Sequence, residues 1–235
     1  MNILLLMMAG SGRRFGADIP KQFVEVDGKP VFSYILKGYD KCSLVDQIVV
    51  VTHPDWVDFV EEWKQRLGIC KLFAIVPGGD TRSESVRNGL IAAYPLGEQD
   101  EKAVVLIHDA THPYVDEEGT RLVIEAVHQY GGATLGERQY DTVYQIDAET
   151  ELLECVVPRQ KIVAGASPEA FFFRDLYKIY MESTREEMEK MTSAGAIALH
   201  HGIKMKSVDA NVINLKITYK NDMEGFKALV KQYFP

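Results

Sequence analysis

Cysteine is scarce in this sequence, and its scarcity excludes two kinds of small protein. Only three cysteines occur, Cys42, Cys70 and Cys155. An odd, widely spaced set provides neither the paired framework of a disulfide-rich secreted domain nor the close spacing of a metal site. We therefore expect free thiols, a reducing compartment and a cytoplasmic protein.

Long apolar runs are also missing. No stretch approaches the roughly 20 apolar residues that a membrane-spanning helix needs, so we expect no membrane association. The apolar start, Ile3–Met8, has no basic segment before it and no small-residue cleavage site after it. A signal peptide has both features, so we do not expect one here.

Positive charge is in deficit. Lys and Arg total 26 against 34 Asp and Glu, which gives a formal net charge of −8. This balance excludes nonspecific binding to nucleic acid, which needs a basic surface, so any anion site must be built locally. What is present is an ordinary globular composition, 46% apolar over 235 residues, which is enough for a substantial core.

Apolar runs of strand length alternate with helical segments through the first 130 residues. The predicted strands are Asn2–Met8, Gln47–Thr52, Leu72–Val76 and Ala103–His108, and the predicted helices are Pro30–Tyr39, Trp56–Leu67, Ser83–Ala93 and Glu118–Tyr130. This alternation predicts right-handed βαβ units. The expected fold class is therefore α/β, with a Rossmann-like, doubly wound and mostly parallel sheet.

The pattern changes after Gly131. Asp141–Ile146 and Leu152–Val157 predict a protruding antiparallel β-arm, at about 139–160, around an acidic turn. The later expected elements are a helix near Phe173–Ser183, a charged helical stretch near Thr184–His200, strands at Lys204–Val208 and Ile213–Thr218, and a last helix at Met223–Tyr233. Because no linker, repeat or low-complexity segment interrupts the chain, we expect one domain over residues 1–235.

A glycine-rich, basic loop follows the first predicted strand. It begins Ala9-Gly10-Ser11-Gly12-Arg13-Arg14, and Lys21 adds a further cation. Glycines let backbone N–H groups approach an anion closely. No Gly-Lys-Ser/Thr follows, so the loop is not a Walker A motif, and Gly16 lies one residue too late for the dinucleotide fingerprint. Since ligands bind at the carboxyl ends of parallel strands, we expect Gly78–Ser85 and Asp109–Pro113 to meet this loop.

These loops resemble those of a known family. Ala9-Gly10-Ser11-Gly12-x-Arg14, followed by Pro20-Lys21-Gln22-Phe23, is similar to the opening signature of the cytidylyltransferases that make 4-diphosphocytidyl-2-C-methylerythritol or CDP-ribitol. Further motifs match the family in the same order: Gly78-Gly79-Asp80-x-Arg82-x-x-Ser85, His108-Asp109-Ala110, Asp141-Thr142, Arg159, Ser167-Pro168-Glu169-Ala170-Phe171 and Asn214-Leu215-Lys216-Ile217-Thr218. The match spans nearly the whole chain.

The resemblance implies a fold like that of the nucleotide-diphospho-sugar transferases, and an activity. The enzyme would move CMP from CTP to a polyol phosphate, 2-C-methyl-D-erythritol 4-phosphate first, and release pyrophosphate. Mg²⁺ would be bound mainly through the CTP phosphates, with Asp109 as its candidate protein ligand. The arm would enter a second subunit, which makes the expected protein a homodimer.

The resemblance also implies roles for individual residues. Those expected in catalysis are Arg14, Lys21, Arg159 and Lys216. Those expected to bind CTP are Ala9, Gly10, Ser11, Gly12, Gly79, Asp80, Ser85 and Asp109. Those expected to bind the acceptor are Thr142, Arg159 and Lys216. No general base is needed, because the acceptor is already a phosphate dianion and catalysis can rest on positioning and charge.

Three departures from the family pattern affect the expected acceptor side. His112 stands where the family has arginine before Pro113, Ser193 stands where it has a carboxylate, and Pro158 precedes Arg159 where methylerythritol enzymes often have aspartate. A neutral imidazole cannot replace the fixed charge of arginine. Ribitol 5-phosphate, or another polyol or sugar phosphate, therefore remains an alternative acceptor.

Functions outside this activity also have to be weighed. A catalytically inactive nucleotide-binding homologue remains open because of the altered residues. A glycosyltransferase would need an Asp-x-Asp motif after the fourth strand, where this sequence has His108–His112. The glycine spacing argues against a nicotinamide-dependent oxidoreductase.

Overall fold

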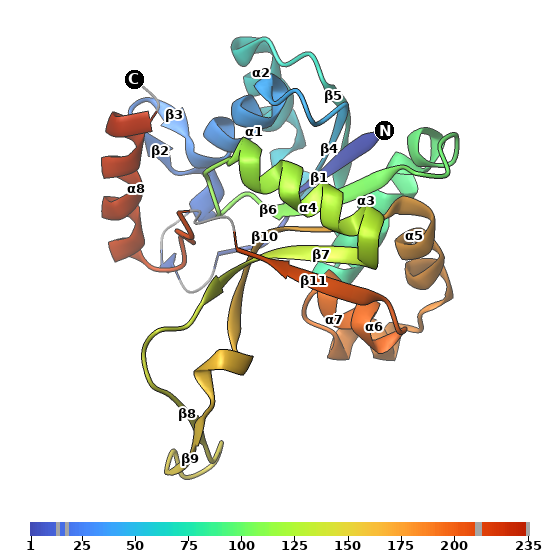
Figure 1. Ribbon diagram of the computed structural model, residues 1–235. Helices are drawn as coiled ribbons and strands as arrows, with labels where there is room; N and C mark the ends of the chain where they lie inside the picture. Colours follow the sequence, from blue (N-terminus) through green and yellow to red (C-terminus); the bar gives the residue numbers. More distant parts are fainter. Residues whose placement is uncertain (13–14, 17–18, 210–212, 234–235) are drawn as a thin grey trace.

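A central sheet organises the computed structural model, which describes residues 1–12, 15–16, 19–209 and 213–233. Its strand order is β11-β7-β10-β6-β1-β4-β5 (Figure 1). The bounds are β1 Asn2–Met8, β4 Gln47–Thr52, β5 Leu72–Pro77, β6 Val104–Asp109, β7 Gly131–Arg138, β10 Val163–Phe172 and β11 Lys204–Val208. In this sheet β10 pairs antiparallel with β6 and β7, while the other pairings of the sheet are parallel. The predicted mostly parallel α/β sheet is confirmed.

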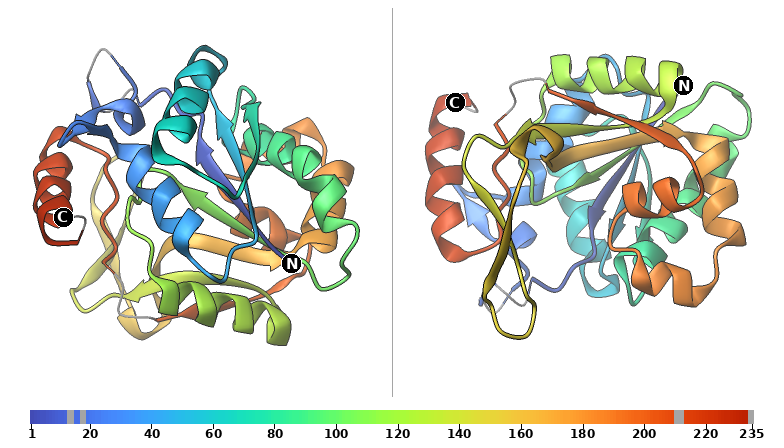
Figure 2. Two further views of the ribbon diagram at one scale, coloured as in Figure 1. Left: turned by 90° about the horizontal axis from the view of Figure 1, so that it is seen from above. Right: turned by 60° about the horizontal axis from the view of Figure 1, so that its bottom comes forward.

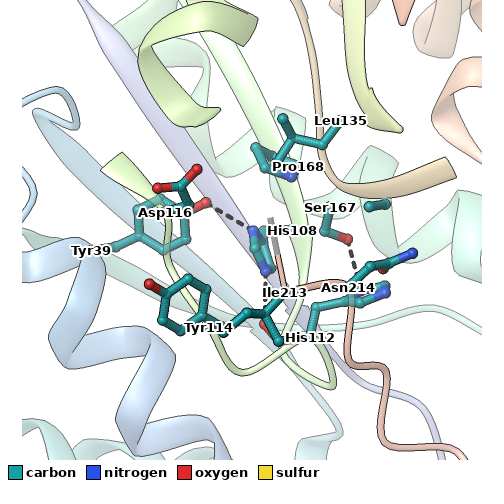
Figure 3. Close-up of a pocket in the computed structure, with 11 residues that line it drawn as sticks. Tyr39, His108, His112, Tyr114, Asp116, Leu135, Ser167, Pro168, Ile213 and Asn214 are labelled. Atoms are coloured by element: carbon teal, nitrogen blue, oxygen red, sulfur yellow. Dashed lines mark hydrogen bonds between the residues drawn. The ribbon is translucent and has the colours of Figure 1, made fainter. Parts of the chain in front are cut away.

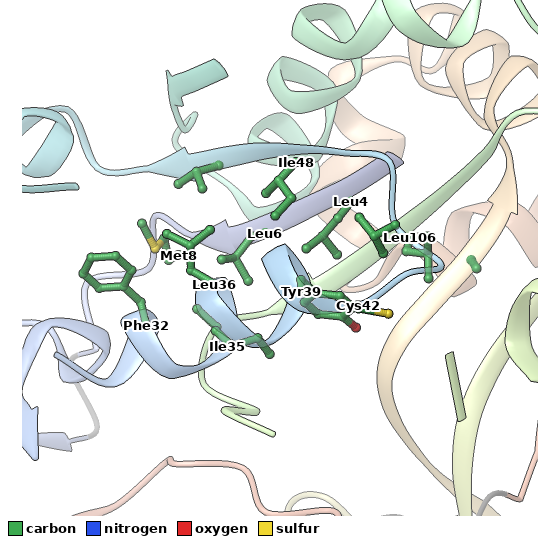
Figure 4. Close-up of a cluster of buried hydrophobic side chains, with 14 of the residues drawn as sticks. Leu4, Leu6, Met8, Phe32, Ile35, Leu36, Tyr39, Cys42, Ile48 and Leu106 are labelled. Carbon is green, nitrogen blue, oxygen red and sulfur yellow. The ribbon is translucent and has the colours of Figure 1, made fainter. Parts of the chain in front are cut away.

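Alternate side chains of β1 enter two hydrophobic clusters on opposite faces of the sheet, as the period of a strand requires. Leu4, Leu6 and Met8 pack with α1 (Val31–Lys41), α2 (Val57–Leu67) and α4 (Glu117–Tyr130), and Figure 4 shows them against α1. Ile3, Leu5 and Met7 pack with α3 (Arg82–Gly97), α5 (Phe173–Glu182) and α7 (Ala194–His200). Both faces of the strand are therefore buried, which explains its uninterrupted apolar sequence.

The C-terminal helix α8 (Lys220–Tyr233) forms a third cluster with the N-terminal segment. Its Met223, Phe226 and Val230 pack on Val26 and Val31. Those two residues belong to the hairpin of β2 (Glu25–Val26) with β3 (Lys29–Pro30), and to the start of α1. Figure 2 shows α8 beside this segment in both views. The packing draws the last part of the chain towards the loop that follows β1.

The predicted arm is present. β8 (Val143–Ile146) and β9 (Leu153–Val157) pair antiparallel in a separate two-stranded sheet. The short 3₁₀ helix η4 (Arg159–Lys161) follows, and Figure 1 shows the hairpin projecting away from the central sheet. Several of its large apolar side chains, including Tyr144, Leu153 and Val156, are about half exposed or more. The arm therefore presents an apolar surface that the described part of the chain leaves uncovered.

One prediction for the second half is wrong. Ile213–Thr218 is not a strand, because Leu215 and Ile217 pack in the α8 cluster while the segment crosses the strand ends. Among its contacts with the rest of the fold is the bond from Ile217 N–H to Thr111 C=O, at 2.8 Å. The charged stretch Thr184–His200 is helical as predicted, but it divides into two short helices, α6 (Arg185–Lys190) and α7, and Ser193 caps the start of α7.

β7 and β10 were missed by sequence reasoning. β7 carries Gly131, Gly132 and Gly136, and β10 carries Gly165 and Pro168, residues that weaken a strand signal. The arm connects the end of β7 to the start of β10, so the pairing of these two strands supports its base.

No helix among the described residues has both the length and the apolar character to span a bilayer.

Candidate active site

A cleft of about 670 Å³ opens at the carboxyl ends of β1, β5 and β6. This is the edge where ligands bind in α/β sheets. Of the residues proposed from sequence, those lining the cleft are Ala9, Gly10, Ser11, Gly12, Lys21, Gly79, Asp80, Ser85, Asp109 and Lys216. Three loops far apart in sequence therefore meet at one site, as expected.

The first loop is held by a residue to which the sequence analysis gave no role. The buried Gln22 donates from Nε2 to the carbonyls of Met8 and Gly10, at 2.7 and 2.8 Å. Gly12 has φ of +66°, a conformation that other residues rarely adopt. The two hydrogen bonds tie the start of the loop to Gln22. The expected catalytic residue Arg14 lies outside the described residues.

The second loop packs directly on the first. A Cβ on Gly78 would lie 2.4 Å from Cβ of Ala9, so only glycine allows this approach. Ser85 Oγ accepts the Gly79 N–H at 3.1 Å and donates to the Thr81 carbonyl at 2.9 Å. Ser85 therefore orders the loop from behind, while Gly79 faces the cleft.

The helix that follows this loop is capped by Thr81. Thr81 is the N-cap of α3 and forms a capping box with Glu84. The neighbouring Asp80 takes no part in the cap, and its side chain is 87% exposed at the rim of the cleft. Its carboxylate is therefore available to a ligand in the cleft.

Asp109 lies between two cations at the end of β6. Arg82 Nη2 donates to its Oδ1 and Lys216 Nζ donates to its Oδ2, both at 3.1 Å. Burial alone would raise the pKa of this carboxyl, but Arg82 and Lys216 hold it well below its usual range. Asp109 is therefore ionised at neutral pH, and the cluster can bind a phosphate group or a cation by exchanging these contacts.

The site suits a magnesium ion that arrives with a polyphosphate. Among the described residues, no group of three or more His, Cys, Asp or Glu side chains is arranged as a metal cage. Mg²⁺ usually keeps several waters and substrate phosphate oxygens and takes only one or two carboxylates. Asp109, with its side chain 21% exposed in the cleft, fits that requirement.

Lys21 reaches the cleft from the turn after Pro20. Its ammonium donates to the Ile217 carbonyl, so the segment that carries Lys216 also holds Lys21. The two lysines thus line one cleft although they are far apart in sequence. Together with Arg82 they give a local positive region in a protein of net charge −8, as an anion site requires.

Two predicted site residues lie elsewhere. Thr142 and Arg159 belong to the arm, and neither lines the cleft. Arg159 Nη1 donates instead to the Tyr140 carbonyl at 2.5 Å. Within the described part of one chain, the arm therefore contributes nothing to the cleft.

Behind Asp109, two histidines form a buried polar network, shown in Figure 3 around a cavity of about 10 Å³. His108 Nε2 lies 2.8 Å from the His112 carbonyl, and its Nδ1 lies 2.8 Å from the Tyr39 hydroxyl. His112 Nδ1 lies 3.0 Å from Ser167 Oγ, which also accepts the Asp109 N–H at 3.4 Å. The network fixes the backbone around Asp109.

Both histidines are held neutral. Burial lowers the pKa of His108 to about 4 and that of His112 to about 3. His112 is therefore a neutral positioning group rather than a replacement for the charge of the arginine that the sequence pattern led us to expect.

We predict that His108→Gln flattens the pH dependence of stability. The folded-state pKa of His108, about 4, lies below the unfolded value of about 6.5. Its contribution is thus present above pH 6.5 and lost as pH falls towards 4. The fall in unfolding free energy between pH 7 and pH 5 should be smaller by about 2 kcal/mol in the variant. Urea denaturation at both pH values measures this, with the exposed His201→Gln as matched control; equal slopes for wild type and His108→Gln would contradict it.

Comparison with known proteins shows which family the sequence matches. The family model described as IspD, 2-C-methyl-D-erythritol 4-phosphate cytidylyltransferase, matches residues 2–232. A protein of that name from Thermotoga neapolitana is 33% identical, over 99% of this chain and 98% of that protein. A ribitol-5-phosphate cytidylyltransferase from Streptococcus agalactiae serotype Ia is 31% identical, over 97% of this chain and 95% of that protein.

A search of solved structures finds proteins with the same fold. The crystal structure of the 4-diphosphocytidyl-2C-methyl-D-erythritol synthase from Anaerococcus prevotii superposes with a TM-score of 0.80 and 24% identity. The match covers 98% of this chain and 96% of that one. The likeness therefore extends through the sheet, the helices and the arm.

Proposed function

The chain belongs to the IspD family of cytidylyltransferases, and on that premise we propose that it transfers CMP from CTP to 2-C-methyl-D-erythritol 4-phosphate, with release of pyrophosphate. Members of this family are CTP-dependent nucleotidyltransferases, and this chain is an enzyme of that class. The observation that carries the proposal is the meeting of Lys21, Arg82, Asp109 and Lys216 in one cleft. We also propose that residues 1–235 act as one catalytic domain.

In this proposal the first two loops bind CTP. Ala9, Gly10, Ser11 and Gly12 line the cleft from the first loop, and Gly79 and Asp80 line it from the second. Gly78 packs directly on Ala9, so the two loops lie close together, and we expect the base site beside them to favour a pyrimidine over a purine. Ser85 supports the base-binding loop through Gly79 and Thr81.

The chemical step is an in-line displacement at the α-phosphorus. An oxygen of the acceptor phosphate forms the new P–O bond, the bond from the α-phosphorus to the bridging oxygen breaks, and pyrophosphate leaves. Lys21, together with Arg14, neutralises charge on the transition state, while Lys216 positions the acceptor. No described residue has to remove a proton, because the acceptor phosphate is already a dianion.

Asp109 is the residue that would hold Mg²⁺ in this reaction. When bound, the metal neutralises the triphosphate and the leaving pyrophosphate. Asp109 is ionised at neutral pH and opens onto the cleft, which is what a carboxylate ligand needs. Arg82 and Lys216 keep its charge balanced until then.

We further propose a homodimer in which each arm completes the partner's site. The arm carries Thr142 and Arg159 but lies away from its own cleft, and it exposes apolar side chains such as Leu152, at 68%, and Leu153, at 65%. Exposed apolar clusters of this kind mark interaction surfaces. In a dimer Thr142 and Arg159 would bind the acceptor phosphate of the partner's site.

Mixed dimers test this arrangement. We expect chains carrying Lys21→Ala and Arg159→Ala, co-expressed with two different tags and purified on both, to show about half of wild-type activity. One site of each mixed dimer then has an intact cleft and an intact arm, whereas each single-variant dimer has no such site.

The variant Arg159→Ala alone should weaken use of the acceptor and leave CTP binding unchanged. Inactive mixed dimers would show that each arm serves its own cleft, and failure to recover any mixed dimer would contradict the homodimer.

Ribitol 5-phosphate is the second candidate acceptor. It is supported by the similarity to a ribitol-5-phosphate cytidylyltransferase and by the neutral His112 beside the site. Pyrophosphate release, measured as kcat/KM with each acceptor in turn and with ATP, GTP and UTP as controls, distinguishes the two. A higher value with ribitol 5-phosphate would replace the first proposal.

A further inference from the structure

Only one oxygen of the Glu169 carboxylate accepts a hydrogen bond among the described residues. It lies on β10 with its side chain 16% exposed, and its Oε1 accepts the Gly195 N–H at 2.9 Å. Its Oε2 is fully buried and has no hydrogen-bond partner among the described residues. Buried carboxylate oxygens normally have a partner, so this atom requires an explanation.

Among the described residues, Arg82 is the cation that lies near that oxygen. Nη2 of Arg82 lies 3.6 Å from Glu169 Oε2 and 3.1 Å from Asp109 Oδ1. The guanidinium therefore sits between two carboxylates and donates to only one of them. A movement of roughly 0.6 Å towards Glu169 would bring Nη2 within ordinary hydrogen-bond distance of Oε2.

Asp109 already accepts from two cations. In this structure Arg82 donates to its Oδ1 and Lys216 to its Oδ2. A metal ion that binds Asp109 competes with these two cations for the same carboxylate. Lys216 is 46% exposed and can turn to solvent or substrate, whereas Arg82 is more enclosed. Removing one partner of an enclosed ion pair is costly because the other charge is left uncompensated.

We propose that Glu169 is a positioning residue that receives the Arg82 guanidinium when Asp109 turns to a metal–nucleotide complex. Glu169 acts through Arg82 and touches neither nucleotide nor metal. The inference rests on the proposed function, since it assigns a movement of Arg82 to the same CTP site.

The test compares CTP binding to the full-length protein with and without metal, at pH 8. Isothermal titration calorimetry gives the CTP affinity in excess Mg²⁺ and in EDTA, and the ratio of the two measures the coupling. We expect Glu169→Gln to lower this ratio about tenfold, by weakening binding in Mg²⁺. Glutamine still accepts the Gly195 N–H, so a purely structural role of Glu169 predicts no change. Glu101→Gln, at an 84% exposed carboxylate, is the control for net charge.

The direction of the change in CTP affinity distinguishes this role of Glu169 from a simple effect of its charge. Loss of a negative charge alone should tighten binding of an anionic ligand under both conditions. If Glu169 acts through Arg82, Glu169→Gln should have no further effect on the ratio in an Arg82→Ala background. An unchanged ratio, tighter binding under both conditions, or a full effect in the Arg82→Ala background would each overturn the inference.

A second variant keeps the test decisive if Glu169→Gln does not fold. Arg82→Lys replaces the planar guanidinium by a compact ammonium with a different donor geometry, so we expect the ratio to fall again. An unchanged ratio in Arg82→Lys would overturn the inference. Wild-type protein that binds no CTP would instead contradict the proposed function, and with it the inference.

Discussion

Replacing Lys21 by alanine should lower kcat for pyrophosphate release by about 10²-fold or more, which is the usual loss when one group that stabilises transition-state charge is removed. Lys21 lines the cleft and is anchored at the Ile217 carbonyl, beside the segment that carries Lys216. Its ammonium therefore has a defined position from which to neutralise negative charge on the oxygens of the reacting phosphate.

The measurement is steady-state pyrophosphate release with both substrates saturating. The exposed Lys41→Ala, at the end of α1, removes the same side chain outside the site and is the matched control. Thermal denaturation checks that both variants fold. Turnover of Lys21→Ala within a few-fold of wild type would remove this lysine from the mechanism.

The second large effect is expected at Asp109. Asp109→Asn should lower kcat/KM for CTP by about 10²-fold or more and raise the Mg²⁺ concentration needed for half-maximal activity. The amide has nearly the same shape but removes the charge that pairs with Arg82 and Lys216. It leaves two neighbouring cations without their shared partner and takes away the candidate metal ligand.

Rates measured over a range of Mg²⁺ concentrations test both parts of this expectation. Asp58→Asn, at an exposed position in the first turn of α2, is the control for the loss of one carboxylate. Activity within threefold of wild type, with an unchanged Mg²⁺ requirement, would show that Asp109 has no part in metal or nucleotide binding.

The long strands and helices of the first half were predictable from sequence because each of them has an uninterrupted signal. Strand β4 was predicted at Gln47–Thr52 and observed with those bounds, since both of its faces are buried and its sequence is continuously apolar. β7 and β10 were missed because glycine and Pro168 interrupt their sequences, and only pairing across the sheet makes them strands. Ile213–Thr218 has a strand-like sequence, but its apolar residues serve the α8 cluster.

The site was predictable to the level of its loops but not of its contacts. The order of strands and loops along the chain was enough to predict that Lys21, Gly79 and Asp109 lie in one cleft. Sequence reasoning assigned no role to Arg82 or Glu169, although both lie in motifs that it used. Their roles depend on side-chain approach between β10, α3 and β6, which no local pattern encodes.

Cytidylyl transfer is tested most directly by ³¹P NMR of the wild-type protein with CTP, Mg²⁺ and 2-C-methyl-D-erythritol 4-phosphate, repeated with ribitol 5-phosphate. We expect one acceptor phosphate signal to be replaced by those of a diphosphate, in equal amount to the pyrophosphate released, and CTP to be stable when no acceptor is added. CTP that stays intact with every acceptor, or that is hydrolysed to CMP without one, would contradict cytidylyl transfer as the function of this protein.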